Sequence, residues 1–419
     1  MSFTTISVVG LGYIGLPTAI LLAYHGISVI GIDVAQHIIK SVNTGRLHIV
    51  EPELDVMLKD VVTKGNFRAT TIPEPADAFI IAVPTPFTSG HKPDVSYIES
   101  AANALAPVLK KGNLVILEST SPVGTTERLA SWLATARPDL SFPQQAGDNA
   151  DVQVAYCPER VLPGKILQEL VDNDRVVGGM SARALERATE LYQIFVRGNI
   201  AITNSRTAEL CKLAENSFRD VNIAFANELS IICDKLGIDV WELIHLANRH
   251  PRVNILQPGC GVGGHCIAVD PWFIVDSMAT EARLIRTARE INDFKPHWVL
   301  DKVKAVICDV QNKHQGKDIA DVTVACLGLA FKPDIDDLRE SPAVQITSMI
   351  AGLGCKILAV EPNISTLPSK LAQKNISLVS QENAIDKADI VCLLVNHTPF
   401  RNLVDRISST THLILTVEM

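Results

Sequence analysis

Residues 8–15 read Val-Val-Gly-Leu-Gly-Tyr-Ile-Gly, and this stretch decides the fold of the first part of the chain. It places a Gly-x-Gly-x-x-Gly pattern directly between a strand pattern at residues 6–10 and a helical pattern. Gly10 allows a tight turn, Gly12 lets a pyrophosphate approach the backbone, and Gly15 lets the helix lie close to the sheet. Because a helix N-terminus also offers unpaired N–H groups to phosphates, the stretch predicts a dinucleotide site.

The second expected strand, residues 28–33, ends at Asp33, 18 residues after Gly15. A carboxylate in this position accepts hydrogen bonds from ribose hydroxyls and repels a 2′-phosphate, so the sequence favours NAD over NADP. The alternative is a βαβ turn that serves packing only. The strand, the glycines and the acid together favour the dinucleotide site.

The first third of the chain alternates strand and helix patterns. Further strands are expected at residues 78–83, 114–119 and 154–156, and residues 141–151 read as a loop within the same domain. This alternation predicts a parallel sheet covered by helices on both faces. Thr85 and Thr120 follow two of the strands at the edge of the sheet where ligands bind in such folds, although turn chemistry alone would also explain these polar loops.

The rest of the chain predicts a helical region followed by a second α/β region. One helix is expected at residues 205–236, capped by Asn204 or Ser205 and ended by Gly237, and another at residues 281–293 that breaks at Pro296 and resumes. Strands are then expected at residues 322–328, 356–361, 390–395 and 413–417. Residues 388–395 repeat the pattern of residues 76–83.

The fold class is therefore α/β, with two Rossmann-like doubly wound domains joined by a central all-helical domain with one long helix. We expect an N-terminal NAD-binding domain at residues 1–203, the helical domain at 204–314, and the second Rossmann-like domain at 315–419.

The length, composition and charge of the chain favour some classes of protein and argue against others. The 419 residues are too many for one core, and 47% hydrophobic with 20% charged residues is typical of globular chains. No signal peptide and no apolar stretch of membrane-spanning length are recognised, and a net charge of −8 argues against nucleic acid and anionic membranes as partners. Nine scattered cysteines indicate a reducing, cytoplasmic location. No metal is expected, because no second ligand pair with zinc spacing follows Cys260 and Cys266.

Lys212, Asn216 and Arg219 are spaced by four and three, so they share one face of the long helix. A solvated polar face is the simpler interpretation of such a stripe. The amide between two cations argues against it, as do the neighbouring apolar positions, which predict a helix that is otherwise largely buried: Leu213, Phe218, Val221 and Phe225.

Residues 258–272 contain four glycines within seven residues, followed by Cys266, Asp270 and Pro271. The glycines free the backbone for close approach to a ligand, which a merely structural thiol would not need. Asp270 before Pro271 also reads as a helix cap, and a cap alone is a serious alternative. A thiolate beside a dinucleotide site suits an oxidation that continues from aldehyde to acid: the thiolate adds, hydride leaves, and water cleaves the thioester.

Residues 157–160, 209–220 and 261–271 resemble the motifs of the UDP-glucose/GDP-mannose dehydrogenase family, and the resemblance extends over nearly the whole chain. It implies four-electron oxidation of a UDP-sugar with two NAD+. The expected substrate is UDP-N-acetyl-D-mannosamine, for enterobacterial common antigen or related surface polysaccharide synthesis. UDP-glucose and UDP-N-acetylglucosamine are alternatives. The final residues, 413–419, lack the Asp-x-Lys/Arg-Gly tail expected from the family.

The resemblance also implies roles for individual residues. Cys266 is the expected nucleophile, Lys212 acts in proton transfer, and Asn216 donates a hydrogen bond. The remaining catalytic residues handle water and thioester hydrolysis: Asp270, Thr120 and Glu159. The expected NAD contacts, besides the glycines Gly10, Gly12 and Gly15, are Tyr13, Ile14, Asp33, Thr85, Thr126 and Arg339. The expected UDP-sugar contacts are Arg160, Val161, Lys212, Asn216, Arg219, His250, Arg252, Gly263, Phe331 and Lys332. The resemblance implies a homodimer through the central helical domain, with Arg252 offered across its interface.

Two other classes of function remain open at this level. A two-electron hydroxyacid dehydrogenase with the same layout would have no use for Cys266. An NAD-sensing regulator would not need the combination of Lys212, Asn216, Cys266 and Asp270.

Overall fold

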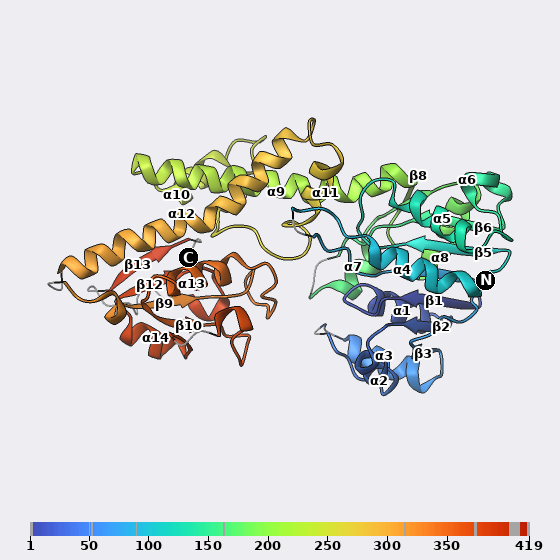
Figure 1. Cartoon of the computed structure of the whole chain (residues 1–419), viewed down its shortest axis with the longest axis horizontal. Coiled ribbons are helices and arrows are strands. Elements are labelled where there is room, and N and C mark those ends of the chain that lie inside the picture. The colour runs from blue at the N-terminus through green and yellow to red at the C-terminus, as the bar shows by residue number, and fades with distance from the viewer. Residues whose placement is uncertain are drawn as a thin grey trace. The chain divides into compact units, whose positions relative to one another are not determined.

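The computed structural model describes residues 3–49, 51, 53–88, 90–161, 164–313, 316–372, 375–401 and 411–416. The chain forms two compact units, Met1–Glu215 and Asn216–Met419, and the division falls within one long helix. Figure 1 shows one sheet in each unit, wholly parallel in the second and largely parallel in the first. The α/β fold with two Rossmann-like sheets and a helical central region is as predicted.

Among the described residues, the first unit contains an eight-stranded sheet in the order β3-β2-β1-β4-β5-β6-β7-β8. All neighbours are parallel except β6 and β7. The strands are β1 Thr5–Val9, β2 Ser28–Ile32, β3 Phe67–Thr70, β4 Ala78–Ile81, β5 Asn113–Leu117, β6 Val152–Tyr156, β7 Arg175–Gly179 and β8 Ile200–Asn204. The helices are α1 Gly15–Tyr24, α2 Gln36–Asn43, α3 Leu54–Thr63, α4 Ser96–Leu105, α5 Thr125–Ala136, α6 Pro143–Ala146, α7 Ile166–Asp172 and α8 Ala182–Tyr192, with 3-10 turns η1 Ala106–Val108 and η2 Gly147–Asn149.

Alternate residues of the central strands pack on opposite faces of this sheet. Val8 and Ile80 belong to an apolar cluster that includes α1, α3 and α8, whereas Val9 and Ile81 belong to a second cluster with α4 and α5. This confirms a sheet covered on both faces, and it explains why buried parallel strands read as continuous apolar runs. Strands β1 to β3 are added toward one edge of the sheet, and β4 and the strands after it toward the other. The point between β1 and β4, where the order of the strands switches, is where ligands bind in doubly wound folds.

The predicted strands of this unit are present within one or two residues of their expected bounds, but β3, β7 and β8 were not predicted. Strand β3 is the edge strand beside β2, and β8 at the opposite edge carries exposed residues, so neither shows a buried apolar run. The expected loop at 141–151 instead contains α6 and η2. Pro143 starts that turn of helix, and the Phe142 N–H donates to Gln145 Oε1 at 2.9 Å.

In the second unit the sheet order is β11-β10-β9-β12-β13, with every neighbour parallel. Its elements are β9 Thr323–Leu327, α13 Pro342–Ala351, β10 Lys356–Val360, β11 Ile376–Leu378, α14 Gln381–Lys387, β12 Ile390–Leu393 and β13 His412–Leu415, with 3-10 turns η3 Ile319–Asp321, η4 Ser369–Leu371 and η5 Thr398–Phe400. The last strand was expected to reach Val417, which lies outside the described residues.

The two sheets repeat the same turn after their first strands. The Gly10 N–H donates to the Ile32 carbonyl at 2.8 Å, and the Gly328 N–H donates to the Val360 carbonyl at 2.8 Å. In each case the following N–H, of Leu11 or Leu329, donates to the acid that ends the second strand, Asp33 or Glu361. The internal repeat expected from β4 and β12 therefore extends to hydrogen bonds at the strand ends.

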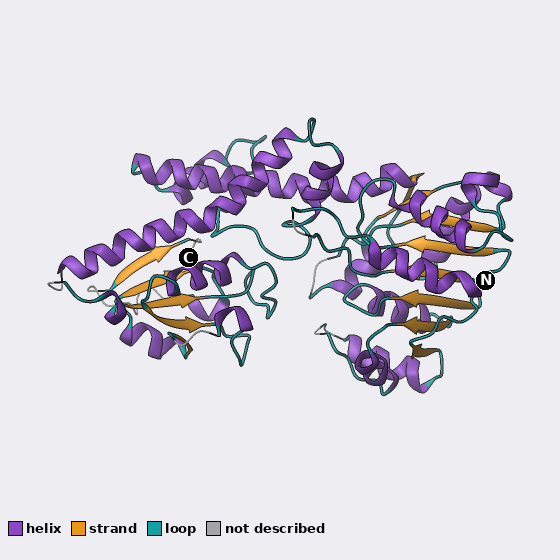
Figure 2. Cartoon of the chain, viewed as in Figure 1, coloured by secondary structure: helices purple, strands orange, loops and turns teal. Residues whose placement is uncertain are grey.

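The helical region consists of α9 Ser205–Leu236, α10 Val240–Ala247, α11 Asp270–Ser277 and α12 Arg283–Lys313. Helix α9 has the predicted bounds, with Asn204 Oδ1 accepting from the Thr207 N–H at 2.9 Å and Gly237 in the left-handed region at φ 68°. The predicted break in α12 is wrong, because the helix continues through Pro296 (Figure 2). Pro296 is buried, as are Asn292 and Val299 on either side, so packing of both halves keeps the helix continuous.

The expectation that α9 is largely buried around its polar stripe is wrong in part, although Leu213 is buried and Val221 is half-buried as expected. Phe218 is 69% exposed and Phe225 is 50% exposed, whereas Lys212 and Asn216 are buried. The alternative of a solvated polar face fails for these two residues as well, although Arg219 is exposed. No helix among the described residues is long and apolar enough to cross a membrane.

Candidate active site

The turn between β1 and α1 needs glycine at two of its three positions. Gly10 has φ 92°, and a methyl group added there would stand 2.5 Å from the Ala82 carbonyl oxygen. At Gly15 an added methyl group would stand 1.9 Å from the Gly10 carbonyl oxygen. Gly12 has no atom within 4 Å of the same position and is exposed, so packing within the protein does not require glycine there. Its open backbone fits a ligand that approaches closely. Tyr13 and Ile14 complete the turn before α1.

Asp33 is fixed at the end of β2 by its neighbours. Its Oδ2 accepts from the Leu11 N–H at 3.0 Å and its Oδ1 accepts from the Ala35 N–H at 2.9 Å. An ionised carboxylate has further acceptor positions, so the half-buried Asp33 can still accept from ribose hydroxyls. The residues of this turn therefore fit NAD, which supplies a hydride acceptor when it is bound.

Two threonines after adjacent strands lie together at the same edge of the sheet. Thr85 Oγ1 donates to the Thr120 carbonyl oxygen at 2.5 Å, joining the loops that follow β4 and β5. Thr126 lies at the start of α5, where its N–H and hydroxyl donate to Glu209 Oε1 at 2.7 and 2.6 Å. Glu209 also accepts from the Gly124 N–H at 2.6 Å, so it caps α5 from α9.

Glu159 and Lys212 are two of the buried charged residues of this unit. Burial raises the pKa of Glu159, against the opposing effects of the Lys212 and Arg175 charges. Its Oε1 has no hydrogen-bond partner among the described residues. A buried carboxylate with a free oxygen and a raised pKa is suited to accept a proton from water.

Arg175 and Glu118 were not recognised from the sequence. Both side chains are buried, Arg175 Nη1 lies 3.5 Å from Glu118 Oε1, and the Tyr192 hydroxyl donates to Glu118 at 2.9 Å. Burial raises the pKa of Glu118 to about 7. A charged residue directly after the apolar run of β5 was the available signal, because such a position lies at the ligand edge of the sheet.

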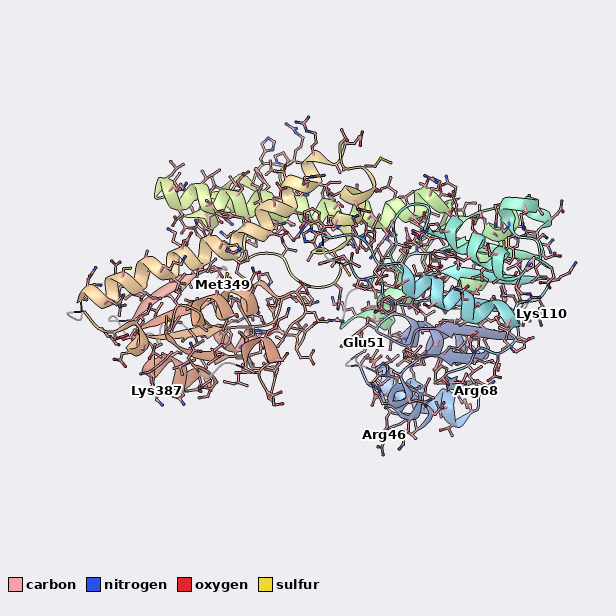
Figure 3. The ribbon with its side chains drawn as sticks, viewed as in Figure 1. Arg46, Glu51, Arg68, Lys110, Met349 and Lys387 are labelled. Carbon is pink, nitrogen blue, oxygen red and sulfur yellow. The ribbon has the colours of Figure 1, made fainter. Side chains whose placement is uncertain are left out.

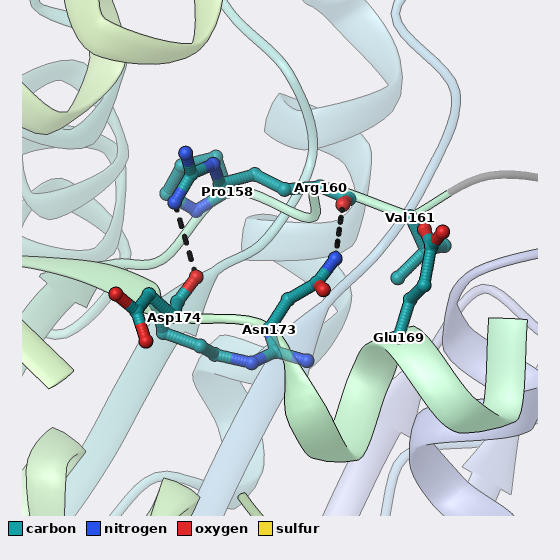
Figure 4. Close-up of a pocket in the computed structure, with 7 residues that line it drawn as sticks. Pro158, Arg160, Val161, Glu169, Asn173 and Asp174 are labelled. Carbon is teal, nitrogen blue, oxygen red and sulfur yellow. Dashed lines mark hydrogen bonds between the residues drawn. The ribbon is translucent and has the colours of Figure 1, made fainter. Parts of the chain in front are cut away.

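Arg160 lies against its own unit (Figure 4). Its guanidinium pairs with Glu215, at 2.7 Å from Nη2 to Oε1, and Nη1 donates to the Asp174 carbonyl at 3.0 Å. The small cavity lined by Arg160 and Val161 has a volume of about 10 Å³, enough for one water molecule. Glu51 is labelled in Figure 3. Its carboxylate accepts from the Gly164 and Ile166 N–H groups at 2.9 and 2.6 Å, and so it fixes the start of α7, which follows Val161 in the chain.

In the second unit, Asn216 and Asp270 meet directly. Asn216 Nδ2 donates to Asp270 Oδ2 at 2.5 Å, and both side chains are buried. The prediction that Asp270 caps α11 is wrong. Val269 is the cap residue, without a side-chain cap bond, Asp270 is the first helical residue, and Pro271 is the second. The carboxylate of Asp270 accepts from Asn216 on α9.

Cys266 is exposed and lies one turn before α11, where its carbonyl accepts from the Val269 and Asp270 N–H groups at 3.1 and 2.8 Å. The glycines before it pack tightly. A methyl group at Gly263 would stand 2.5 Å from the Glu340 carbonyl oxygen and 2.8 Å from Phe331 Cβ. The Gly264 N–H donates to the Arg339 carbonyl at 3.1 Å. The structure therefore brings Gly263, Phe331 and Arg339 together.

The other expected substrate residues of this unit are less constrained. Lys332 Nζ lies 6.0 Å from the Phe331 ring centre, and Arg219, His250 and Arg252 are exposed. His250 and Arg252 belong to the segment after α10 rather than to the glycine-rich segment. Among the described residues no group of His, Cys, Asp or Glu is arranged to hold a metal ion.

The first unit thus has the glycine turn and the oriented acid of an NAD-binding domain, and the second has a thiol with a buried Asn–Asp pair at α11. Family models match this arrangement along the chain. The NAD binding domain of the UDP-glucose/GDP-mannose dehydrogenase family matches residues 4–196, its central domain 206–294, and its UDP binding domain 325–416.

Similar proteins carry two different names. The chain is 59% identical over 411 residues to an NDP-N-acetyl-D-galactosaminuronic acid dehydrogenase of Ralstonia nicotianae, covering 98% of this chain and 95% of the relative. It is 60% identical over 402 residues to the UDP-N-acetyl-D-mannosamine dehydrogenase of Escherichia coli, covering 96% and 95%. The solved structure of a UDP-D-ManNAc dehydrogenase from Pyrococcus horikoshii matches with a TM-score of 0.87 at 38% identity, covering 99% of this chain and 95% of that one.

The chain belongs to the UDP-glucose/GDP-mannose dehydrogenase family and is an NAD-dependent UDP-sugar dehydrogenase.

Proposed function

We propose that this protein oxidises UDP-N-acetyl-D-mannosamine to its uronate with two NAD+ and one water, through a covalent intermediate on Cys266. The observation that carries the four-electron chemistry is the exposed Cys266 one turn before Asp270, whose carboxylate is held by Asn216. An exposed thiol can capture an aldehyde, and a fixed carboxylate one turn along the chain suits the later hydrolysis of the thioester.

The reaction proceeds in three stages under this proposal. The C6 alcohol loses a proton and a hydride to give the aldehyde. The Cys266 thiolate adds to the aldehyde carbon, and the thiohemiacetal loses a second hydride to become a thioester. Water then cleaves the C–S bond and returns the thiol, so one alcohol, two NAD+ and one water give one carboxylate, two NADH and three protons.

The buried ionisable groups suit the proton steps. Lys212 would take and return the proton at the C6 oxygen and stabilise oxyanions there. Asn216 and Asp270, with Thr120, would hold the attacking water, and Glu159 would accept its proton. The raised pKa and free Oε1 of Glu159 support that last role.

Cations would hold the diphosphate of the UDP-sugar, since phosphate recognition needs Arg and Lys. The proposed contacts are Arg160, Val161, Arg219, His250, Arg252, Gly263, Phe331 and Lys332. The salt bridge from Arg160 to Glu215 means that Arg160 would exchange a carboxylate for a phosphate on binding. The proposed NAD contacts are Gly10, Gly12, Tyr13, Ile14, Gly15, Asp33, Thr85, Thr126 and Arg339.

A homodimer through the helical domain completes the proposal, with Arg252 offered across its interface. Phe218, Phe225 and Ile232 recur every seven residues along α9 and are exposed. Exposed apolar side chains at heptad spacing support packing against a second copy. None of the nine cysteines, all within the described residues, is in a disulfide, which supports a reducing cytoplasm as the place of reaction. We also retain the three domains at 1–203, 204–314 and 315–419.

The similar proteins are named for different sugars, so the sugar that this enzyme prefers has to be measured. The Ralstonia relative's name favours an N-acetylgalactosamine-type sugar, and UDP-glucose and UDP-N-acetylglucosamine remain alternatives. We propose enterobacterial common antigen or a related surface polysaccharide as the use of the product, because of the relatives named for UDP-N-acetyl-D-mannosamine. Comparing kcat/KM for these four UDP-sugars tests the proposal. The highest value for UDP-N-acetyl-D-mannosamine supports it, and a higher value for another sugar refutes the assignment.

A further inference from the structure

Two buried asparagines connect α9 to α12 in the second unit, away from the proposed catalytic residues. Asn227 on α9 and Asn292 on α12 are 0% and 1% exposed, and Asn227 Nδ2 donates to Asn292 Oδ1 at 2.8 Å. Buried amides at these positions are costly unless their hydrogen bonds are made. Both amides have further hydrogen-bond partners at their other ends.

At one end the chain of hydrogen bonds reaches a buried ion pair. Asn292 Nδ2 donates to Asp220 Oδ1 at 2.8 Å and to the Asp220 carbonyl at 3.1 Å. Arg289 Nη1 donates to the same carboxylate at 2.7 Å, and both charged side chains are buried. Asp220 directly follows Arg219 and lies one turn after Asn216, so this end is anchored within the functional part of α9.

At the other end the chain of hydrogen bonds reaches the segment that carries Cys266. The Gly259 N–H donates to Asn227 Oδ1 at 2.9 Å. Gly259 opens the glycine-rich segment, and Gly261 two residues later lies against α12, where an added methyl group would stand 3.3 Å from the Asn292 carbonyl oxygen.

The direction of these bonds is fixed by chemistry. The Asp220 carboxylate paired with Arg289 only accepts, so Asn292 must present its Nδ2 to it and its Oδ1 to Asn227. Asn227 must then present its Nδ2 to Asn292, which leaves its Oδ1 for the Gly259 N–H, and a backbone N–H can only donate. Each amide therefore has one orientation that satisfies all partners, and the network holds the Gly259 backbone at one position relative to α9 and α12.

We propose that Asn227 and Asn292 are positioning residues that hold the glycine-rich segment, and through it Cys266, in place against α9 and α12. The proposal rests on the proposed function, in which Cys266 is the nucleophile. A displaced nucleophile slows the chemical step more than it weakens substrate binding, because binding does not depend on near-attack geometry.

The test compares Asn227→Ala with the matched control Ser230→Ala in the full-length protein. Ser230 is a buried polar residue one turn further along α9. It donates to the Asn227 carbonyl at 2.6 Å and accepts from Lys295 Nζ on α12, so its loss also breaks buried hydrogen bonds between α9 and α12, but none to the glycine-rich segment. Two quantities are measured: the alkylation rate of Cys266 by iodoacetamide, followed by peptide mass spectrometry, and kcat and KM for UDP-N-acetyl-D-mannosamine.

For Asn227→Ala we expect the Cys266 alkylation rate to change by about threefold or more and kcat to fall about 10- to 100-fold, with KM within about threefold. Ser230→Ala should match the unmodified protein in both quantities even if the two variants lose similar thermal stability. Equal kcat losses in the two variants, or unchanged values in Asn227→Ala, would overturn the proposal.

If Asn227→Ala does not fold, Asn292→Ala is judged by the same criteria, since it removes the bond that orients Asn227 and leaves the Gly259 contact. The two hypotheses can fail separately. No NADH from the unmodified protein with any UDP-sugar would reject the proposed function, while the alkylation comparison would still decide whether Asn227 positions Cys266.

Discussion

Substituting single glycines of the turn after β1 separates cofactor binding from packing. At Gly12 an added methyl group meets no protein atom within 4 Å, and its φ lies outside the left-handed region that favours glycine. Gly12→Ala should therefore leave the free energy of unfolding unchanged or raise it by roughly 0.4–1 kcal/mol, because alanine lowers the conformational entropy of the unfolded chain. If the exposed backbone of Gly12 faces the pyrophosphate, the KM for NAD+ should rise about 10- to 100-fold, equivalent to about 1.4–2.8 kcal/mol.

Gly15→Ala is the matched comparison in the same turn. Its methyl group would stand 1.9 Å from the Gly10 carbonyl oxygen, so the helix must move away from the sheet at a cost of about 1–3 kcal/mol or more. Urea denaturation without cofactor measures the stabilities, and initial rates against NAD+ concentration give KM. A Gly12→Ala protein that is destabilised but keeps its KM for NAD+ would rule out a cofactor role for this glycine, because the turn would then serve packing alone.

Three further predictions concern the acid, the buried ion pair and the exposed face of α9. Because burial raises the pKa of Glu159 above its ordinary 4.5, the base form is lost on acidification at a higher pH than for an exposed glutamate. The kcat–pH profile should fall below that raised pKa, and Glu159→Gln should lower kcat by about 10²–10⁴ and remove this limb; an unchanged profile would contradict the role. Arg289→Met leaves the Asp220 carboxylate buried without its cation and should cost about 3–5 kcal/mol in urea denaturation, and adding Asp220→Asn should recover part of that loss. Phe225→Glu should convert a dimer to a monomer in light scattering, whereas exposed Lys304→Glu on α12 should not; a Phe225→Glu dimer would argue against this interface.

The local features of the fold were predictable from the sequence because short-range rules decide them. The β1 turn needs glycine at Gly10 for its left-handed backbone angle, φ 92°, and at Gly15 because the Gly10 carbonyl lies five residues before it. Asp33 ends a strand that the apolar pattern marks. Helix α9 was predicted with its bounds because its Asn204 cap and Gly237 end are local signals.

Features that depend on tertiary partners were not predictable in this way. Asp270 has the sequence of a cap, but its carboxylate bonds to Asn216 on another helix. Pro296 should end a helix, but packing on both sides keeps α12 continuous. Phe218 and Phe225 are apolar residues of the kind that helices bury, yet both are exposed. Helix periodicity identifies an apolar face, but it does not identify what covers that face. Arg175 and Glu118 were missed because only the folded sheet brings them together.

The stoichiometry of NADH formation tests the central proposal most directly. With UDP-N-acetyl-D-mannosamine limiting and NAD+ in excess, we expect two NADH per sugar and the uronate as product. Cys266→Ser should not complete this four-electron oxidation at a normal rate, since a serine hydroxyl is a far weaker nucleophile than a thiolate. One NADH per sugar from the unmodified protein, or full turnover by Cys266→Ser, would contradict the account.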